Sequence, residues 1–405
     1  MHKTELLIPA GDLEKLQTAV RFGADAVYVG AGPYSLRTQQ TAFDLEDLKQ
    51  GVEFAHQYKV KVYLAMNIFP FDEDLPKMME YLDQAVKLKV DAVIVSDPGL
   101  ISLIRQKHPK LILHLSTQAN TINSPAVKFW KDQGVQRIVL GRELSLAQVK
   151  AIRKEVPDIE LELFVHGAMC MSYSGRCLLS KHMTGRSANR GECTQPCRWE
   201  YHLKEVTRPD EDFRIEQDAR GTYVMNSKDL CMIEHIPEMV NLGIDSLKVE
   251  GRMKSSYYVA LVTKIYRQAI DQDRYDPTWL EELKKVSHRN YTTGFYLDEN
   301  DKENEELGSY TRSYTFVGIV AGHHNNKLEV LARNLFQVGD QLEIMDPMVK
   351  EIRKFKVVEI RNQAGLSQDK AHNDHHVFIS AEFSGPISQH SLLRRRIPVK
   401  KLRPL

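Results

Sequence analysis

The sequence lacks any run of 18 or more apolar residues, which is the length that a helix needs to cross a bilayer. Its first residues, MHKTELLIPAG, also lack the charged start and apolar centre of a secretory signal. They are typical of a strand that ends in a turn. We therefore expect a cytoplasmic protein with no membrane partner.

Cysteine is scarce, with five residues in a chain of 405. Secreted disulfide scaffolds are small and rich in cysteine, so we expect these thiols to be reduced or bound to a metal. Charge of one sign is also lacking, because 55 Lys and Arg face 54 Asp and Glu. Contact with a nucleic acid would therefore require a local basic patch.

Two hydrolase motifs, HExxH and GxSxG, are absent from the sequence. Ser, His and Asp residues are present, but a catalytic triad is a geometric arrangement that spacing alone does not establish. The sequence motifs therefore give no independent reason to expect proteolysis.

One pattern recurs eight times in the first 250 residues: a short β-branched run followed by an amphipathic helical stretch. The runs begin at Leu6, Asp25, Lys61, Asp91, Leu111, Gln136, Glu160 and Ile244. Strands that alternate with helices pair in parallel, and eight such units close a TIM-like (β/α)8 barrel. A doubly wound open sheet is the alternative that the same alternation permits.

Three segments are predicted. The barrel spans residues 1–275 and includes a cysteine-containing insertion over 168–226, after the seventh strand. A helical linker spans 276–312, and a small antiparallel β-barrel spans 313–405, where the hydrophobic period changes to two. The insertion has about sixty residues, far more than an ordinary βα loop, and we expect it to be functional. The next helix is expected to start near Ser227.

Active sites of such barrels lie at the carboxyl ends of the strands. The candidates are therefore the polar residues that follow the runs: Arg37, Asn67, Gln118, Asn120, Arg142, Glu143, His166, Glu250 and Arg252. Any one of them could instead cap a loop or form a structural ion pair.

Four of the five cysteines lie in one window with the spacing C-x6-C-x15-C-x3-C, namely Cys170, Cys177, Cys193 and Cys197. Zinc sites usually pair their ligands more closely, whereas an iron-sulfur cluster accepts thiolates from separate loops. We therefore expect a [4Fe-4S] cluster, with structural zinc as the alternative. Spacing leaves the fourth ligand open between Cys197 and Cys231.

A long motif runs from the seventh strand into the insertion. It comprises Glu162, Phe164, Gly167, Ala168, Met169, Cys170, Gly175, Cys177, Leu179 and Ser180. This pattern resembles, position for position, the signature of the U32 peptidase family. The segments LIPAG, STQAN, GRELS, NSKDL and KVEGRMKS also look like family motifs, so the resemblance covers most of residues 1–270.

The resemblance implies more than one activity. The family is named for members described as collagenases, but other branches act in oxygen-independent hydroxylation. One branch forms 5-hydroxyuridine at the tRNA wobble position with prephenate as hydroxyl donor, and another acts in anaerobic ubiquinone synthesis. Those relatives carry a 4Fe-4S cluster, and the ubiquinone pattern implies Cys170, Cys177, Cys193 and Cys231 as ligands. Chain length, the five cysteines and the appended β-barrel look closer to the tRNA branch.

The expected function is therefore iron-sulfur-dependent hydroxylation of tRNA, with prephenate as donor and a paralogous U32 subunit as a further candidate partner. The carboxylates of prephenate suit bidentate binding by arginine, so Arg37, Arg142 and Arg252 are predicted clamps. His166 or Glu143 would transfer a proton, and Glu250 would orient an arginine. Asn67, Gln118 and Asn120 complete the predicted binding set. A U32-type protease and a non-enzymatic iron-sulfur scaffold are the alternatives.

Overall fold

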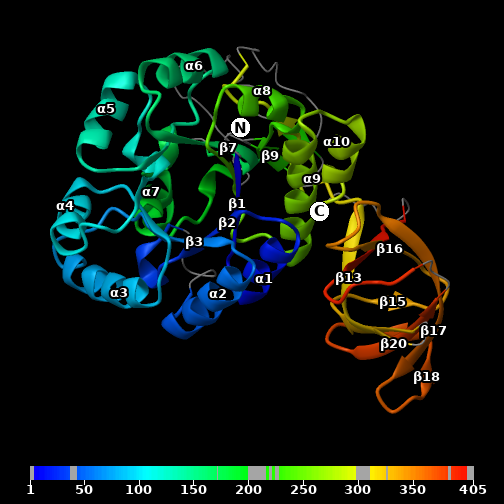
Figure 1. Ribbon diagram of the computed structural model, residues 1–405. Coiled ribbons are helices and arrows are strands. Elements are labelled where there is room, and N and C mark those ends of the chain that lie inside the picture. The colour runs from blue at the N-terminus through cyan, green and yellow to red at the C-terminus, as the bar shows by residue number, and fades with distance from the viewer. Residues whose placement is uncertain are drawn as a thin grey trace.

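A computed structural model describes residues 4–36, 43–170, 172–198, 216–218, 221–223, 228–297, 311–324, 327–381 and 385–398. Figure 1 shows an α/β barrel with a smaller β-barrel beside it, coloured orange to red. No helix within these ranges is both long enough and apolar enough to cross a membrane.

Eight parallel strands form the larger barrel. They are β1 Glu5–Pro9, β2 Ala26–Gly30, β3 Lys61–Met66, β4 Ala92–Val95, β5 Leu113–Leu115, β6 Arg137–Val139, β7 Glu160–Ala168 and β11 Ser246–Val249. Consecutive strands pair from β1 to β7, and β11 pairs with both β1 and β7. This last pairing closes the ring, so the TIM-like barrel is confirmed and the open sheet is excluded.

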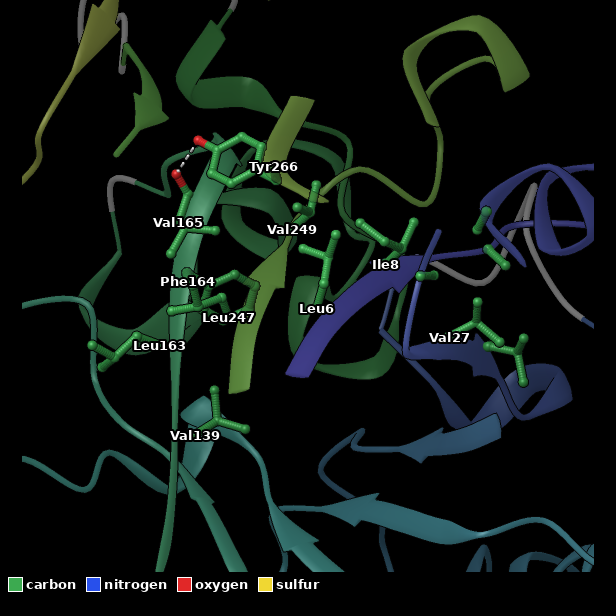
Figure 2. Packing of buried hydrophobic residues seen from close by; sticks show 14 of the residues in the cluster. Leu6, Ile8, Val27, Val139, Leu163, Phe164, Val165, Leu247, Val249 and Tyr266 are labelled. Carbon is green, nitrogen blue, oxygen red and sulfur yellow. Dashed lines mark hydrogen bonds between the residues drawn. The ribbon is translucent and has the colours of Figure 1, made fainter. Parts of the chain in front are cut away.

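Helices surround the barrel (Figure 1). They include α1 Leu13–Arg21, α2 Leu45–Gln57, α3 Leu75–Lys87, α4 Pro98–Lys107, α5 Ser124–Asp132, α6 Leu146–Glu155, α8 Ile236–Asn241 and α9 Ser256–Gln272. Several begin at a side-chain cap, as at Asp12, Asp97 and Ser145, which satisfies backbone donors that the first turn leaves unpaired. Figure 2 shows the apolar layer between strands and helices, where Tyr266 of α9 donates a hydrogen bond to the carbonyl of Val165 (2.9 Å).

The interior of the barrel holds a buried network of charged residues. Arg137 lies between Glu5, to which it donates a short hydrogen bond, and Glu162, whose carboxylate is 3.3 Å away. Tyr63 donates to Glu5 at 2.7 Å, and Lys248 donates to Glu162 at 2.7 Å. Because each buried charge has an opposite partner, the network avoids the cost of isolated ions in the core.

A strand occupies the position where the sequence predicted the start of a helix near Ser227. β10 (Asp229–Cys231) pairs antiparallel with the end of β7, and α8 begins only at Ile236, after a short 3-10 turn over Ile233–His235. Pairing explains the difference, since β7 extends beyond the barrel and offers a free edge to β10. The predicted helix start was therefore wrong.

The described part of the insertion contains the helix α7 Leu179–Thr184 and short 3-10 turns at Tyr173–Gly175, Ala188–Arg190 and Pro196–Arg198. A two-stranded ribbon, β8 Glu216–Asp218 and β9 Gly221–Tyr223, follows. After α9 come α10 Pro277–Leu283 and β12 Tyr291–Thr292, which pairs with β10.

The smaller barrel is built from six antiparallel strands: β13 Tyr314–His324, β14 Lys327–Ala332, β16 Gln341–Met345, β17 Arg353–Asn362, β20 His376–Ala381 and β21 Leu392–Arg396. Their order is β16-β21-β13-β14-β20-β17, and pairing of β16 with β17 closes it. The short strands β15 Phe336–Gln337, β18 Ser367–Gln368 and β19 Lys370–Ala371 lie at its margin. This confirms the predicted β-barrel, which packs beside α9 and α10 (Figure 1).

Candidate functional site

The carboxyl ends of the barrel strands and the insertion after β7 together line a cavity of about 450 Å³. Strands β2 to β7 and β11, or the loops that follow them, all contribute lining residues. The volume lies within the range of sites for small molecules. The site is therefore where the barrel fold predicts it, with the insertion forming one wall.

Ion pairs and hydrogen bonds hold the insertion to the barrel. Glu143, after β6, accepts hydrogen bonds from the backbone N–H of Ser174 (2.5 Å) and from its hydroxyl (2.9 Å). Arg190 donates to both carboxylate oxygens of Asp74 at 2.7 and 3.0 Å. Glu143 lines the cavity, but both of its oxygens already bind the insertion, so its observed role is to position that wall.

Side-chain amides form a second wall. Asn67 donates to the Ser116 hydroxyl and to the Gln118 carbonyl oxygen, both at 3.1 Å, and accepts from the N–H of Leu36 at 3.2 Å. Arg176 of the insertion donates to the backbone carbonyl of Gln118 at 2.8 Å. The predicted residues Asn67 and Gln118 are thus brought together in a fixed network on the cavity lining.

Two predicted arginines also line the cavity. Arg142 donates to the carbonyl of Ala168 at 3.0 Å and stacks on Phe164, with its guanidinium carbon 3.8 Å from the ring centre. Arg252 donates to the hydroxyl of Ser35 at 2.7 Å and to the next backbone carbonyl. Both guanidinium groups therefore fix neighbouring loops and place positive charge on the cavity lining.

Glu250 lies on the cavity wall beside the turn that follows β11. Its backbone N–H donates to the carbonyl of His166 at 2.8 Å, and its carbonyl accepts from the hydroxyl of Tyr258 at 2.7 Å. These bonds hold its backbone between β7 and α9, which determines where the carboxylate projects.

Four cysteines line the cavity: Cys170, Cys177, Cys193 and Cys197. An all-thiolate donor set at one cavity suits an iron-sulfur cluster or zinc. No three His, Cys, Asp or Glu side chains among the described residues lie close enough to hold a single metal ion. The wall thus supplies thiol ligands but no ready-made mononuclear site.

His166 and Cys231 lie together on the other side of β7, away from the cavity lining. The hydroxyl of Tyr266 is 3.2 Å from Nδ1 of His166 and 3.8 Å from Sγ of Cys231. Burial lowers the pKa of His166 to about 3 and raises the pKa of the Cys231 thiol to about 11. At neutral pH both side chains are uncharged in this position, and neither lines the cavity.

Asn120 and Arg37 are the remaining predicted binding residues. Asn120 ends a 3-10 turn over Thr117–Ala119 with a left-handed backbone conformation and does not line the cavity. Arg37 lies outside the described residues.

Lys248 is a charged cavity residue that the site prediction missed. Lys248, on β11, lines the cavity although it is 4% exposed. The alternation in the segment Ser246-Leu-Lys248-Val-Glu250 contained this information, because polar residues at every second position of a barrel strand share its inner face. The prediction considered only residues beyond the strand ends, and Lys248 lies within the strand.

The charged residues of the lining are four cations, Arg142, Arg176, Lys248 and Arg252, and two carboxylates, Glu143 and Glu250. This excess of positive charge favours an anionic ligand. The lining contains no histidine and no aspartate among the described residues. The arrangement can therefore bind a small anion beside a wall of thiols.

Residues 11–306 match peptidase family U32, and residues 312–394 match the peptidase family U32 C-terminal domain. A "tRNA hydroxylation protein P" of Haemophilus influenzae is 39% identical, over 93% of this chain and 93% of its own length. A protein of the same description from Escherichia coli is 41% identical, over 86% and 87% of the two chains.

More distant relatives differ in description. A protein of Porphyromonas gingivalis described as "Collagenase" is 33% identical over 88% of this chain and 90% of its own length. The "23S rRNA 5-hydroxycytidine C2501 synthase" of Escherichia coli is 32% identical over 85% of this chain and 53% of its own length.

Proposed function

The chain belongs to peptidase family U32, and from this premise we propose that it is an RNA-modifying enzyme that hydroxylates tRNA. The relatives with about 40% identity over most of both chains are described as tRNA hydroxylation proteins. A further relative is described as forming a 5-hydroxylated pyrimidine in rRNA. Hydroxylation of a pyrimidine at C5, as in 5-hydroxyuridine at the wobble position, is the reaction that these descriptions and the sequence resemblance favour together.

The observation that carries this proposal is the convergence of four cysteines and four cationic side chains on one cavity. A hydrolase needs a nucleophile next to a base, yet the described lining has no histidine, and Glu143 is occupied by Ser174. Thiols beside an anion-binding pocket fit a redox reaction on a small donor better than hydrolysis of a peptide.

We propose that the cysteine wall holds a 4Fe-4S cluster, with Cys170, Cys177 and Cys193 as three ligands. When bound, such a cluster would supply redox-active iron next to the cavity. The fourth ligand is either Cys197 or Cys231. The sequence resemblance implies Cys231, whereas position favours Cys197, because Cys197 lines the cavity and Cys231 is buried against Tyr266.

For the hydroxyl donor we propose prephenate, on the basis of resemblance and of charge. Prephenate carries two carboxylates, and Arg142 and Arg252 line the cavity as candidate clamps. Glu250, which follows Lys248 on the same wall, is the candidate carboxylate for proton transfer or for orienting an arginine. The tRNA base would enter from the side of the insertion.

The decisive experiment is mass spectrometry of tRNA nucleosides from a strain that lacks the gene. We expect loss of 5-hydroxyuridine and its derivatives, and restoration by the wild-type gene but not by Cys170→Ala. A strain unable to make prephenate should show the same loss if prephenate is the donor. An unchanged nucleoside profile in the deletion strain would refute the proposed function.

The cluster ligands are tested by iron and sulfide content of anaerobically purified variants. Cys170→Ala, Cys177→Ala and Cys193→Ala should each lose about four iron atoms per chain, the content of one cluster. Cys197→Ala and Cys231→Ala are the matched pair, and the one that loses iron contains the fourth ligand. Stoichiometric zinc in the wild-type protein would contradict the cluster.

Proteolysis is the second candidate, since one relative is described as a collagenase. It predicts cleavage of gelatin by protein from which iron has been removed, because a hydrolase would not need the cluster. A scaffold that acts only with a paralogous U32 subunit is the third candidate, and it predicts that the purified chain modifies tRNA only after that subunit is added.

A further inference from the structure

Lys248 lies at the boundary between the charged interior of the barrel and the cavity. Its neighbours on β11, Leu247 and Val249, face the apolar layer outside the barrel, whereas Ser246 and Lys248 bond to interior carboxylates. Lys248 therefore points into the barrel, and its place on the lining identifies it as part of the cavity floor.

The ammonium group has one polar partner among the described residues, Oε1 of Glu162 at 2.7 Å. Its other contacts are aromatic: Nζ lies 4.6 Å from the ring centre of Tyr28 and 5.4 Å from that of Phe164. The hydroxyl of Tyr28 is directed elsewhere, to the carbonyl of Val249 at 3.0 Å. Because an ammonium has three N–H donors, two of them remain for a molecule in the cavity.

The charge balance at the floor supports the same conclusion. Glu162 is fully buried and is shared between Lys248 and Arg137, and Arg137 also pairs with Glu5. Two interior carboxylates are thus matched by two interior cations, and the rest of the lining adds three arginines against the two carboxylates of Glu143 and Glu250. A carboxylate arriving at the floor would meet no uncompensated negative charge, and it would satisfy donors that burial has removed from water.

We propose that Lys248 anchors a carboxylate of the small-molecule donor at the floor of the cavity, with Glu162 holding the ammonium in place. The donor then lies with this anionic end inside the barrel and its other end toward the cysteine wall. This inference rests on the proposed function, because it assigns an orientation to the donor of that reaction. Lys248 would be a binding residue, and Glu162 a positioning residue that acts through it.

The test is calorimetric titration of the full-length, cluster-loaded protein with prephenate and, in parallel, with citrate, which carries carboxylates but lacks the ring and the ketone of prephenate. Lys248→Met removes the ammonium. The double variant Lys248→Met/Glu162→Gln removes the ammonium and also neutralises the Glu162 carboxylate that would otherwise lose this partner. The double variant therefore remains informative if the single variant folds poorly. Lys254→Met is the matched control, since Lys254 follows the same strand but does not line the cavity.

We expect prephenate to bind about tenfold to a hundredfold more weakly to both Lys248 variants, as for loss of one charge-assisted hydrogen bond, and to bind the control as it binds wild type. Equal affinity for wild type and both variants would overturn the inference and leave the proposed function intact. If citrate binds in a Lys248-dependent manner and prephenate does not bind, the anchor stands and the donor is wrong. If neither anion binds wild type, the floor is not a carboxylate site.

Discussion

A buried histidine of the barrel interior makes the stability of the protein depend on pH. His114 on β5 is buried against Tyr63, with ring centres 4.6 Å apart. Burial, together with the positive charges of Arg137 and Lys248, lowers the pKa of His114 well below its usual value. The folded protein therefore keeps this imidazole neutral at pH values where an unfolded chain would protonate it.

The consequence is a loss of stability in acid. Since the unfolded chain binds the proton below about pH 6.5 and the folded protein does not, the free energy of unfolding falls by up to about 1.4 kcal/mol per pH unit for this residue. His114→Asn should make the pH dependence of stability shallower below about pH 6.5, measured by urea unfolding. His182→Asn, at an exposed position on α7, is the control. A slope unchanged by His114→Asn would contradict the assignment.

The residues of the site were predictable to different degrees, for a physical reason. Asn67, Gln118, Arg142, Glu143, Glu250 and Arg252 follow strand ends, and a parallel barrel brings all strand ends to one face. His166 belongs to β7 itself, and simple alternation from Glu162 and Phe164 would turn its side chain inward. The register of β7 with β11 shifts just before it, between Lys248 and Val249, and the His166 ring lies against Tyr266 instead. The sequence pattern does not show where a strand becomes irregular. The direction of the His166 side chain was therefore the part of the site that could not be predicted.

Among the elements, the eight barrel strands and the six main strands of the small barrel followed directly from hydrophobic period. β10 did not, because it stands outside the alternation of strands with helices and is held by pairing with β7 and β12. Strands defined by an available edge rather than by their own pattern cannot be predicted from the periodicity of one sequence.

The junction of β7 with the end of β11 depends on one glycine. Gly167 has a φ of +104°, and a Cβ placed on it would lie 2.4 Å from the carbonyl oxygen of Glu250. Only glycine permits both this conformation and this approach. The absence of a side chain therefore lets the backbone of Glu250 lie against β7, from where its carboxylate reaches the cavity wall.

Gly167→Ala should lower the free energy of unfolding by roughly 2–4 kcal/mol. The alanine would strain the backbone at position 167, and its Cβ would also force the backbone of Glu250 to move away. Gly243→Ala is the matched control, since Gly243 also has a positive φ, of +72°, but a Cβ added there would meet no atom within 4 Å. It should lose only about 1 kcal/mol. If both variants lose the same free energy of unfolding in urea, the close approach of Gly167 to Glu250 is not what requires glycine at this position.

For the whole molecule, one buried arginine joins the two barrels. Arg394 of β21 is fully buried and donates to Glu343 of β16 at 2.8 and 2.6 Å and to Glu282 of α10 at 2.7 Å. Nearby, Tyr257 of α9 stacks on Phe316 of β13 with the rings 6.0 Å apart. The arginine therefore links a carboxylate of each domain, beside the aromatic contact and the hydrogen bond that Lys264 of α9 donates to the carbonyl of Asp346 (2.8 Å).

Removing this cation should uncouple the barrels without unfolding either of them. Arg394→Met removes the cation that Glu282 and Glu343 share and leaves them with Lys285 as their remaining common counter-charge. We expect a loss of about 1–3 kcal/mol, less than for a buried charge left wholly unpaired. Because each barrel keeps its own apolar core, we expect thermal unfolding to separate into two transitions.

The double variant Arg394→Met/Glu343→Gln should restore part of the coupling, since it relieves the repulsion between the two carboxylates. Arg395→Met is the control, because Arg395 pairs with Asp340 inside the small barrel. A single transition unchanged in Arg394→Met would mean that the other contacts, among them those of Tyr257 and Lys264, are enough to hold the two domains together.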